Sequence, residues 1–558
     1  LVVNGAVDFA GGPRLDVFLG YVPALGQVFR IVDNGGGAAV VGSFAGLAEG
    51  ATLTSSYSVV LQVSYAGGDG NDVTLTATSV PKIWTGAVNG LWSEPGNWTG
   101  GVPGAGDVLQ FPVSASSKSM TNDLFAGTVF NRIEWYGTGY TIIGNAFGLT
   151  NGISNSGTNT ISVAVALSGG TASGGSLTFS GAMTLSGNVS VTGALNGAVT
   201  LTGNAKISGT VTGPVDLGAN TLSLASGLIS GAISGTGGVQ LGTDYALARL
   251  TGVNSYTGPT IVALSPSYTY NNRAQIDGIQ TGSAVTVALN PGWGNHRLSG
   301  SGSLGAVVVE PSGSCSSATD VNCNQLSPGQ SDGSATGQMT TAGLQMKSNT
   351  RLILQLNGAI PGSGYDQLVV NGAVDFAGGP RLDATLQIGV VPANGQIFVL
   401  IQNDGTDAVV GTFSGLPEGA TINLGPYPFE ISYVGKTGND VVLISLSGDP
   451  LNEAPVANSD GYSTGFETQL VVAAPGVLGN DTDADLDVLT VISSSLLSAA
   501  GGAVVVDADG AFTYSPPAGF SGDDTFTYVI SDGHDATDIG TVTVTVTTNK
   551  PCTETLTI

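Results

Sequence analysis

Four aspartates alternate with other residues in the stretch NDTDADLD, and no other motif in this sequence points as clearly to a chemistry. They are Asp481, Asp483, Asp485 and Asp487. Carboxylates at every second position of a loop can turn their oxygens toward one hard cation, and Ca²⁺ accepts about six to eight oxygens in irregular geometry. The glycine and glutamate of an EF-hand loop are missing at the usual offsets. The spacing therefore predicts a calcium site of another kind, and a solvated acidic loop is the alternative.

The charge around this motif favours a divalent cation. Residues 449–549 contain 15 Asp and Glu and no Lys or Arg, and such a density of carboxylates is relieved most simply by bound divalent ions. The whole chain has 40 acidic against 14 basic residues and a net charge of −26. Because phosphate binding needs clustered Lys and Arg, we expect no nucleic-acid partner.

Residues suited to catalysis are sparse. His296 and His534 are the two histidines of the chain, so His-centred triads and zinc sites are poorly supplied. Glycoside hydrolysis needs two carboxylates on one groove, and the regular central part of the chain offers Asp216 alone. From these residues we expect a protein that is not an enzyme.

The cysteines indicate an oxidising compartment. Cys315 and Cys323 flank the polar segment SSATDVN and are expected to close a small disulfide ring, with two free thiols as the alternative. Cys552 is left over near the end of the sequence, and it is either idle or paired with something outside this chain.

Three tryptophans gather in one short stretch, at Trp84, Trp92 and Trp98. Exposed tryptophans could stack on sugar rings, whereas large aromatics packed between turns cap the open end of a core. We expect the cap, and carbohydrate binding is the alternative.

The elements that position these residues are organised around an internal repeat. The sequence LVVNGAVDFAGGPRLD occurs at Leu1–Asp16 and again at Leu368–Asp383, identical over 16 residues. The likeness continues beyond it, which defines two copies of one β module, at residues 1–79 and 368–447. Repetition of this kind indicates an array or a solenoid.

Between the copies the sequence predicts an all-β solenoid. A Trp-rich cap at 80–139 is followed over 140–367 by short β segments, evenly spaced and separated by Gly, Ser or Asn. Three such strands would make a coil of about 18 residues in a parallel β-helix, and an antiparallel sandwich is the competing interpretation. Parallel β-helices include polysaccharide lyases and hydrolases, so the fold alone does not exclude catalysis.

The end of the sequence predicts a separate domain. Residues 448–455 have the Gly, Pro and polar composition of a linker. Alternating strands over 456–549 then indicate an Ig-like β-sandwich of about seven strands, followed by a tail at 550–558. No apolar run reaches the roughly 18 residues that a bilayer requires, so we expect no membrane insertion by this chain.

Several motifs of the first part resemble a known repeat. They are LTGVNSYTGPTIV at Leu250–Val262, LSPGQSDG at Leu326–Gly333 and YDQLVVNGAV at Tyr365–Val374. They resemble the autotransporter-associated β-strand repeats of bacterial surface proteins. For residues 1–447 this resemblance implies the right-handed parallel β-helix of a secreted passenger.

The C-terminal part resembles a second family. VANSDGYST, GVLGNDTDADLDVLTV and GAFTYSPPAGFSGDDTFTYVISDG are similar to the cadherin-like, Ig-like tandem domains of large bacterial adhesins. Relatives often bind calcium near domain junctions, which implies Asp460, Asp532 and Asp538 as further ligands.

Together these features predict an extracellular structural or adhesive protein of the bacterial cell surface. The first module begins with a β edge at Leu1, Val2, Val3 and Ala6 that no preceding strand covers, and a bare edge is a template for another chain. We therefore expect head-to-tail assembly into a fibre with other copies, and residues 548–558 are the candidate donor strand. The alternative is a carbohydrate-binding or polysaccharide-degrading β-helix protein whose partners are cell-surface glycans.

Overall fold

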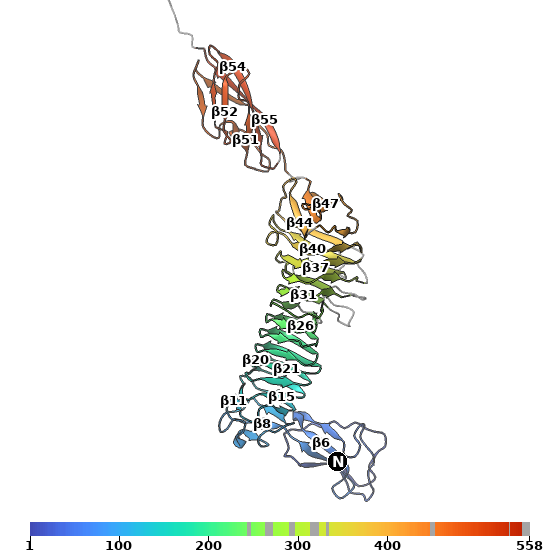
Figure 1. Ribbon diagram of the computed structural model, residues 1–558. Coiled ribbons are helices and arrows are strands. Elements are labelled where there is room, and N and C mark those ends of the chain that lie inside the picture. Colours follow the sequence, from blue (N-terminus) through green and yellow to red (C-terminus); the bar gives the residue numbers. More distant parts are fainter. Residues whose placement is uncertain are drawn as a thin grey trace, which may run out of the picture. The chain divides into compact units, whose positions relative to one another are not determined.

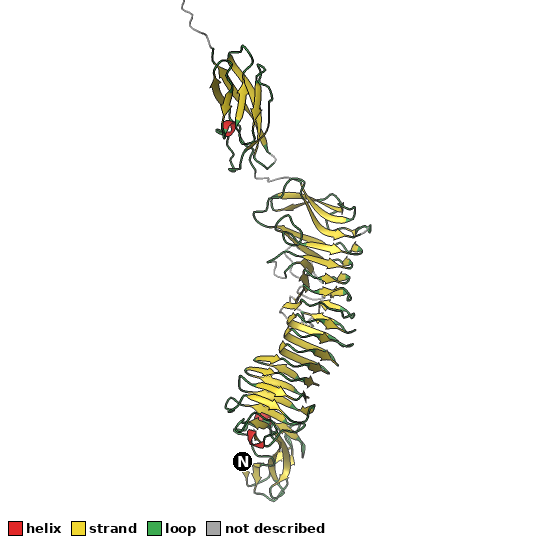
Figure 2. Ribbon diagram, turned by 60° about the vertical axis from the view of Figure 1, so that its left-hand side comes forward, coloured by secondary structure: helices red, strands yellow, loops and turns green. Residues whose placement is uncertain are grey.

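The computed structural model describes residues 1–242, 247–262, 272–288, 296–312, 323–330, 334–404, 406–446, 452–534 and 536–548. Within them the protein is almost entirely β (Figure 2). The helices of the described part are three short 3₁₀ turns: η1 (Ser56–Ser58), η2 (Pro95–Asn97) and η3 (Gly476–Leu478). The chain divides into two compact units, one formed by Leu1–Leu354, Ile360–Asp383 and Gln402–Ser414, the other by Gln355–Ala359, Ala384–Ile401 and Gly415–Ile558.

The first unit contains a parallel β-helix, visible in Figure 1 as a stack of short strands. In its early coils each strand pairs in parallel with the third strand after it, so three strands make a coil. Ile133 pairs with Ile153 and Leu185 with Leu201, and the differences in number show coils of 20 and 16 residues. The predicted coil of about 18 residues is confirmed.

The strands of the β-helix lie in three sheets. The longest contains β8 (Lys82–Trp84), β9 (Trp98–Thr99), β10 (Val108–Phe111), β11 (Ser119–Asn122), β13 (Arg132–Trp135), β14 (Thr141–Gly144), β16 (Gly152–Asn155), β17 (Thr158–Ile161), β19 (Thr171–Ser173), β20 (Ser176–Phe179), β22 (Val189–Leu195), β24 (Ala205–Val211), β26 (Leu222–Ile229), β28 (Val239–Leu241), β29 (Leu247–Leu250), β30 (Thr260–Val262), β31 (Asn272–Ile276), β33 (Val285–Val287), β34 (His296–Gly300), β36 (Val307–Val309), β37 (Asn324–Pro328), β39 (Leu344–Met346), β40 (Thr350–Leu356), β42 (Val374–Phe376), β43 (Arg381–Leu386) and β45 (Val410–Gly411). The second contains β12 (Thr128–Phe130), β15 (Phe147–Leu149), β18 (Val165–Leu167), β21 (Met183–Leu185), β23 (Val199–Leu201), β25 (Val215–Asp216) and β27 (Ile233–Ser234). The third contains β32 (Ile279–Gln280), β35 (Ser303–Leu304), β38 (Gln338–Thr341) and β41 (Gln367–Val370).

Alternating side chains and glycine turns explain why this sequence coils. In β18, β21 and β23 the first and third residues are buried and the middle one is exposed, so each coil adds two apolar side chains to a continuous core. Glycine is required where the coils turn, because neighbouring turns stack in contact. A Cβ built on Gly213 would lie 2.0 Å from the carbonyl oxygen of Gly197. The stacking, rather than an unusual backbone angle, excludes a side chain there.

The first module continues into the β-helix through a polar contact. Gln110 Nε2 donates to the carbonyl oxygen of Tyr57 at 3.0 Å, and Arg132 pairs with Glu134 at 2.7 Å. Ser58 hydrogen-bonds to both Arg132 and Glu134. The first coil therefore starts with β10, earlier than the predicted boundary at residue 140.

The two modules share one fold. The first contains the sheet β1 (Val2–Val3), β3 (Val28–Asn34), β7 (Asp72–Ser79), β6 (Val60–Gly67) and β5 (Thr52–Thr54), and a separate pair of β2 (Asp8–Phe9) and β4 (Val41–Gly42). Antiparallel pairing in the order β3, β7, β6, β5 recurs in the second module as β44 (Ile397–Asn403), β48 (Asp440–Ser445), β47 (Tyr427–Gly435) and β46 (Thr421–Leu424). The repeat read from the sequence is thus a structural repeat.

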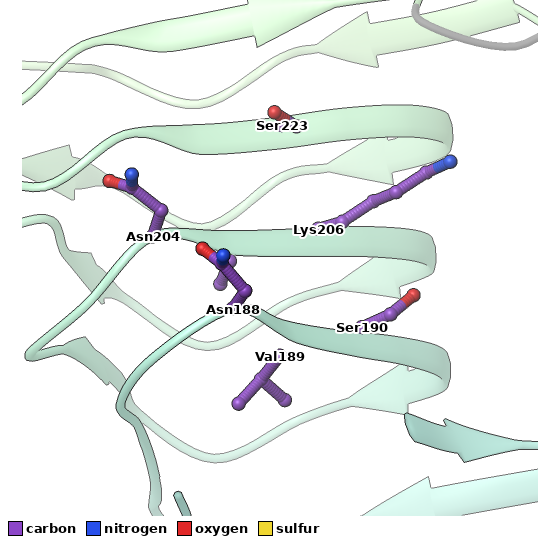
Figure 3. Close-up of a pocket in the computed structure, with 7 residues that line it drawn as sticks. Asn188, Val189, Ser190, Asn204, Lys206 and Ser223 are labelled. Carbon is purple, nitrogen blue, oxygen red and sulfur yellow. The ribbon is translucent and has the colours of Figure 1, made fainter. Parts of the chain in front are cut away.

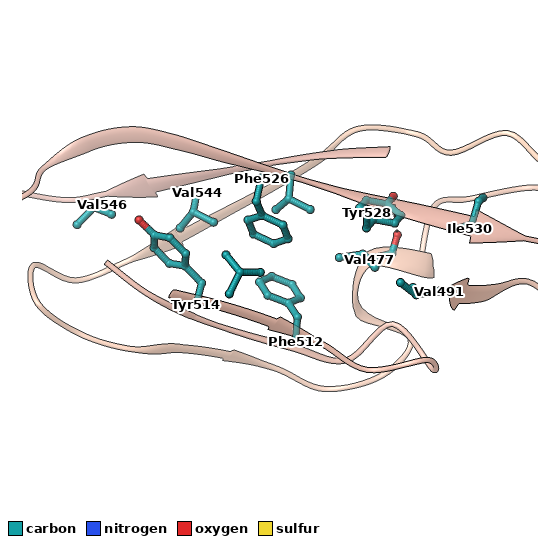
Figure 4. Packing of buried hydrophobic residues seen from close by; sticks show 11 residues of the cluster. Val477, Val491, Phe512, Tyr514, Phe526, Tyr528, Ile530, Val544 and Val546 are labelled. Atoms are coloured by element: carbon teal, nitrogen blue, oxygen red, sulfur yellow. Dashed lines mark hydrogen bonds between the residues drawn. The ribbon is translucent and has the colours of Figure 1, made fainter. Parts of the chain in front are cut away.

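The C-terminal domain is a seven-stranded sandwich. One sheet has the order β49 (Asp460–Thr464), β55 (Thr537–Val546), β54 (Gly522–Ser531) and β51 (Thr490–Ser494), and the other β50 (Leu470–Val472), β53 (Phe512–Ser515) and β52 (Ala503–Val506). Phe526, Tyr528 and Ile530 alternate inward along β54. Figure 4 shows them packed with Phe512 of the facing sheet, where the Phe512 and Phe526 ring centroids lie 5.4 Å apart. The predicted Ig-like sandwich is confirmed.

Candidate metal centre

Three of the alternating aspartates meet in the loop between η3 and β51. The nearest oxygens of Asp483, Asp485 and Asp487 all lie within 4.8 Å of one another. The loop is folded by one of them, because Asp483 Oδ1 accepts the backbone amides of Asp485 at 2.8 Å and Asp487 at 3.3 Å. Two i, i+2 and i, i+4 contacts of this kind curl the loop. The alternating sequence therefore presents three carboxylates to one point.

The second oxygen of Asp483 is the strongest indication of a ligand. Asp483 Oδ2 is buried and has no hydrogen-bond partner. A buried polar atom without a partner costs free energy, and a carboxylate oxygen costs more than a neutral one. A shallow pocket of ≈ 590 Å³ opens beside it, lined among others by Asp481, Asp487 and Asp509. The donor set, all oxygen and all anionic, fits a hard divalent cation.

Asp481 does not join this cluster, which corrects the prediction that four aspartates share one cation. Its Oδ1 accepts the backbone amide of Asn458 at 2.7 Å and lies 3.1 Å from the hydroxyl oxygen of Tyr528. Asp460 Oδ2 lies 3.1 Å from the same hydroxyl. A hydroxyl donates one proton, so two carboxylates compete for it and form a second acidic pair.

The second pair is electrostatically unfavourable as it stands. Burial raises the pKa of Asp460 to about 6, the nearby Asp481 carboxylate adds to the rise, and the Tyr528 hydroxyl opposes it. Burial also raises the pKa of Asp481. Both shifts mean that the folded domain disfavours the negative charge at this pair.

Asp532 and Asp538, the other two expected ligands, hold the beginning of the domain. Asp532 accepts Asn452 Nδ2 at 2.6 Å and the amide of His534 at 2.7 Å. Burial would raise the pKa of Asp532, but these hydrogen bonds keep it below its usual value. Asp538 Oδ2 accepts the amide of Ala457 at 2.8 Å, which lowers its pKa. Neither carboxylate belongs to the three-aspartate cluster.

Sequence reasoning missed two contacts of the cluster. His534 Nδ1 lies 3.0 Å from Asp487 Oδ2, and the backbone amide of Glu453 donates to Asp485 Oδ2 at 2.7 Å. Both partners are distant in sequence and carry no spacing signal. The stretch NEAP directly before the domain was interpreted as linker, and the structure places it along the acidic loop.

The tryptophans are buried. Trp84, Trp92 and Trp98 are 0%, 0% and 5% exposed. Trp92 and Trp98 stand edge to face with ring centroids 5.8 Å apart, and Trp92 also contacts Phe111 in the first coil. The three rings pack at the start of the helical core and present no face on which a sugar could stack.

The cysteines are described only in part. Cys323 is buried and disulfide-bonded, while Cys315 and Cys552 lie outside the described residues. The Cys315–Cys323 pairing stays a prediction.

A second depression lies on the β-helix. Figure 3 shows Lys206 between Ser190 and Ser223, its neighbours in register on adjacent coils. The pocket has a volume of ≈ 260 Å³, and its lining residues include no carboxylate and no histidine: Asn188, Val189, Ser190, Asn204, Ala205, Lys206 and Ser223. This lining provides no acid–base pair for hydrolysis.

A comparison with protein families bears on the acidic domain. Residues 452–548 match the bacterial cadherin-like domain. The match covers the whole sandwich and both acidic groups, and it fits an extracellular adhesive or structural role. A comparison of the chain with curated proteins found no match. Among the described residues, none of the helices has the length and apolarity needed to cross a membrane.

Proposed function

We propose that this chain is an extracellular structural or adhesive protein of the bacterial surface, whose cadherin-like domain is stabilised by calcium. The observation that carries the proposal is Asp483, which offers a buried, unpartnered oxygen inside a cluster of three carboxylates. The domain match supports the surface role. The domain has no Lys or Arg with which its carboxylates could pair.

Calcium would be held by Asp483, Asp485 and Asp487. The ion would supply positive charge where three carboxylates repel one another, and it would give Asp483 Oδ2 the partner it lacks. Because Asp485 also accepts the amide of Glu453, ordering the loop would order the first residues of the domain as well. A domain that carries load at its entry point gains from such a connection.

Calorimetry of the full chain tests this proposal. At a free calcium concentration about 100 times Kd, mass action adds about 2.7 kcal/mol to the free energy of unfolding, so the melting temperature of the cadherin-like domain should rise with calcium and fall in chelator. Asp483→Asn should remove most of this response, because it weakens the central ligand.

The matched control is Asp507→Asn, which removes the same charge from an exposed position outside the cluster. It should leave the calcium response intact. Equal melting temperatures in calcium and in chelator for the unmodified chain would refute the proposal.

A non-enzymatic role is part of the same proposal. His296 is buried in the β-helix, and His534 is held against Asp487. The carbohydrate-binding alternative loses its tryptophans, since all three are buried. Fibre formation and glycan binding stay predictions.

A further inference from the structure

The two modules contain the same 16-residue sequence in different surroundings. In the second module β41 pairs in parallel with β38, matching Met339 with Leu368 and Thr341 with Val370. Beside it, β42 pairs with β39, matching Leu344 with Val374. The preceding coil of the β-helix therefore covers this sequence strand by strand.

In the first module no described strand occupies that place. β1 pairs only with β3 and β2 only with β4, which leaves the outer edge of each without a partner among the described strands. Leu1 is 80% exposed, whereas Leu368 at the same position of the repeat is 0% exposed. Phe9 is partly exposed and its counterpart Phe376 is fully buried.

Two carboxylates show which side chains the covering coil provides. In the second module Gln345 Nε2 donates to Asp375 Oδ2 at 2.8 Å, and Arg351 forms an ion pair with Asp383. The matching residues of the first module are Asp8 and Asp16. Among the described residues, Asp16 makes no ion pair, and no side chain donates to Asp8.

A third difference lies just after the identical stretch. Phe18 is 87% exposed, and the second module has Thr385 at this position. A large apolar side chain on an otherwise open face favours an interaction surface over a solvated one.

From these observations we propose that the face formed by β1, β2 and residues 14–18 is a docking surface for the end coil of a parallel β-helix, of the type formed by β38, β39 and β40. The occupant needs three strands, apolar residues at its inward positions, and an amide and a cation aligned with Asp8 and Asp16. The described chain provides no uncovered coil of this type, because the second module already covers its own. A single added strand would pair with only one of the open edges.

The test extends the full chain at Leu1 with a copy of residues 296–367, so that the grafted coil precedes the first module as it precedes the second. Hydrogen exchange is followed by mass spectrometry on peptides 1–18 and 368–385, which differ in mass at their last two positions. We expect exchange in 1–18 to slow to the level of 368–385. Unchanged exchange in 1–18 would overturn the proposal.

Charge variants separate docking from a general effect of the extension. Replacing the grafted Arg351→Glu should restore fast exchange in 1–18, because the new carboxylate faces Asp16. Adding Asp16→Arg to that variant should restore protection. If the single reversal has no effect, or the double one brings no recovery, the proposed register is wrong.

Sedimentation of the unextended chain over a range of concentrations checks the identity of the occupant. A sedimentation coefficient that does not change, with fast exchange in 1–18 throughout, is the expected result. Association that protects 1–18 would mean that a second copy occupies the face, and it would overturn the assignment to a β-helix end.

Discussion

Asp483 uses its two carboxylate oxygens for different purposes. Oδ1 accepts two backbone amides and shapes the loop, while Oδ2 is buried and unpartnered. Asp460 and Asp481 form a different kind of site, in which one tyrosine hydroxyl lies between two carboxylates of raised pKa. A shared position in the sequence motif thus leads to separate environments, because each side chain follows the partners within its own reach.

A buried histidine makes the β-helix sensitive to mild acid. His296 is buried, its Nδ1 has no hydrogen-bond partner, and burial lowers its pKa below the usual 6.5. Below pH about 6.5 the unfolded chain takes up a proton that the folded chain refuses, so stability falls as the pH falls through this range. We expect a lower melting temperature for the β-helix at pH 5.5 than at pH 7.5.

Calorimetry of variants assigns this effect. His296→Gln should flatten the dependence of the β-helix transition on pH, since the glutamine does not titrate. His534→Gln, in the cadherin-like domain, is the control and should leave that transition unchanged. A slope that persists in His296→Gln would show that another group is responsible.

At the scale of elements, the β-helix depends on turns that stack without side chains. Gly197, Gly213 and Gly231 follow one another in such a column, and a Cβ on any of them would lie about 2.0 Å from a backbone oxygen of the preceding turn. No side-chain adjustment relieves a contact with backbone, so neighbouring coils would have to separate.

Gly213→Ala is therefore expected to destabilise the β-helix by about 1–3 kcal/mol, the usual cost of overpacking. The measurement is the unfolding transition of the β-helix in denaturant. Gly104→Ala is the matched control, because a Cβ there meets nothing closer than Asp107 Oδ2 at 3.9 Å. Equal effects of the two substitutions would contradict the steric explanation.

At the scale of the whole molecule, the repeated module ends in two different ways. The second copy adds its first strands to the last coil of the β-helix, and it covers apolar edges that would otherwise be exposed. The first copy attaches to the start of the β-helix through Ser58, Arg132 and Glu134, and its own coil-forming strands stay open. The same sequence is thus a lid in one place and a socket in the other.

The head-to-tail hypothesis can be examined by truncation. Residues 549–558 lie outside the described residues, and one strand from this tail would cover one open edge of the first module but not the others. We therefore expect a chain ending at residue 547 to sediment, and to look in electron micrographs, like the full chain. Filaments formed by the full chain and lost on truncation would instead identify the tail as the donor.

The sequence by itself determined the periodic features. Glycine-separated β segments predicted coils of about 18 residues, alternation over 456–549 predicted the sandwich, and the exact repeat predicted two equal modules. These features depend on local backbone geometry and on the burial of every second side chain, and both are written in nearest-neighbour order. Asp483, Asp485 and Asp487 were found for the same reason, since one loop brings them together.

Only the tertiary structure decided how distant residues meet. It directed Asp481 toward Tyr528 and Asp460, brought His534 to Asp487, and buried the tryptophans in the helical core. It also showed that one 16-residue sequence is covered in one copy and open in the other. These contacts depend on which surfaces fold against each other across long separations, and no spacing within a segment records them.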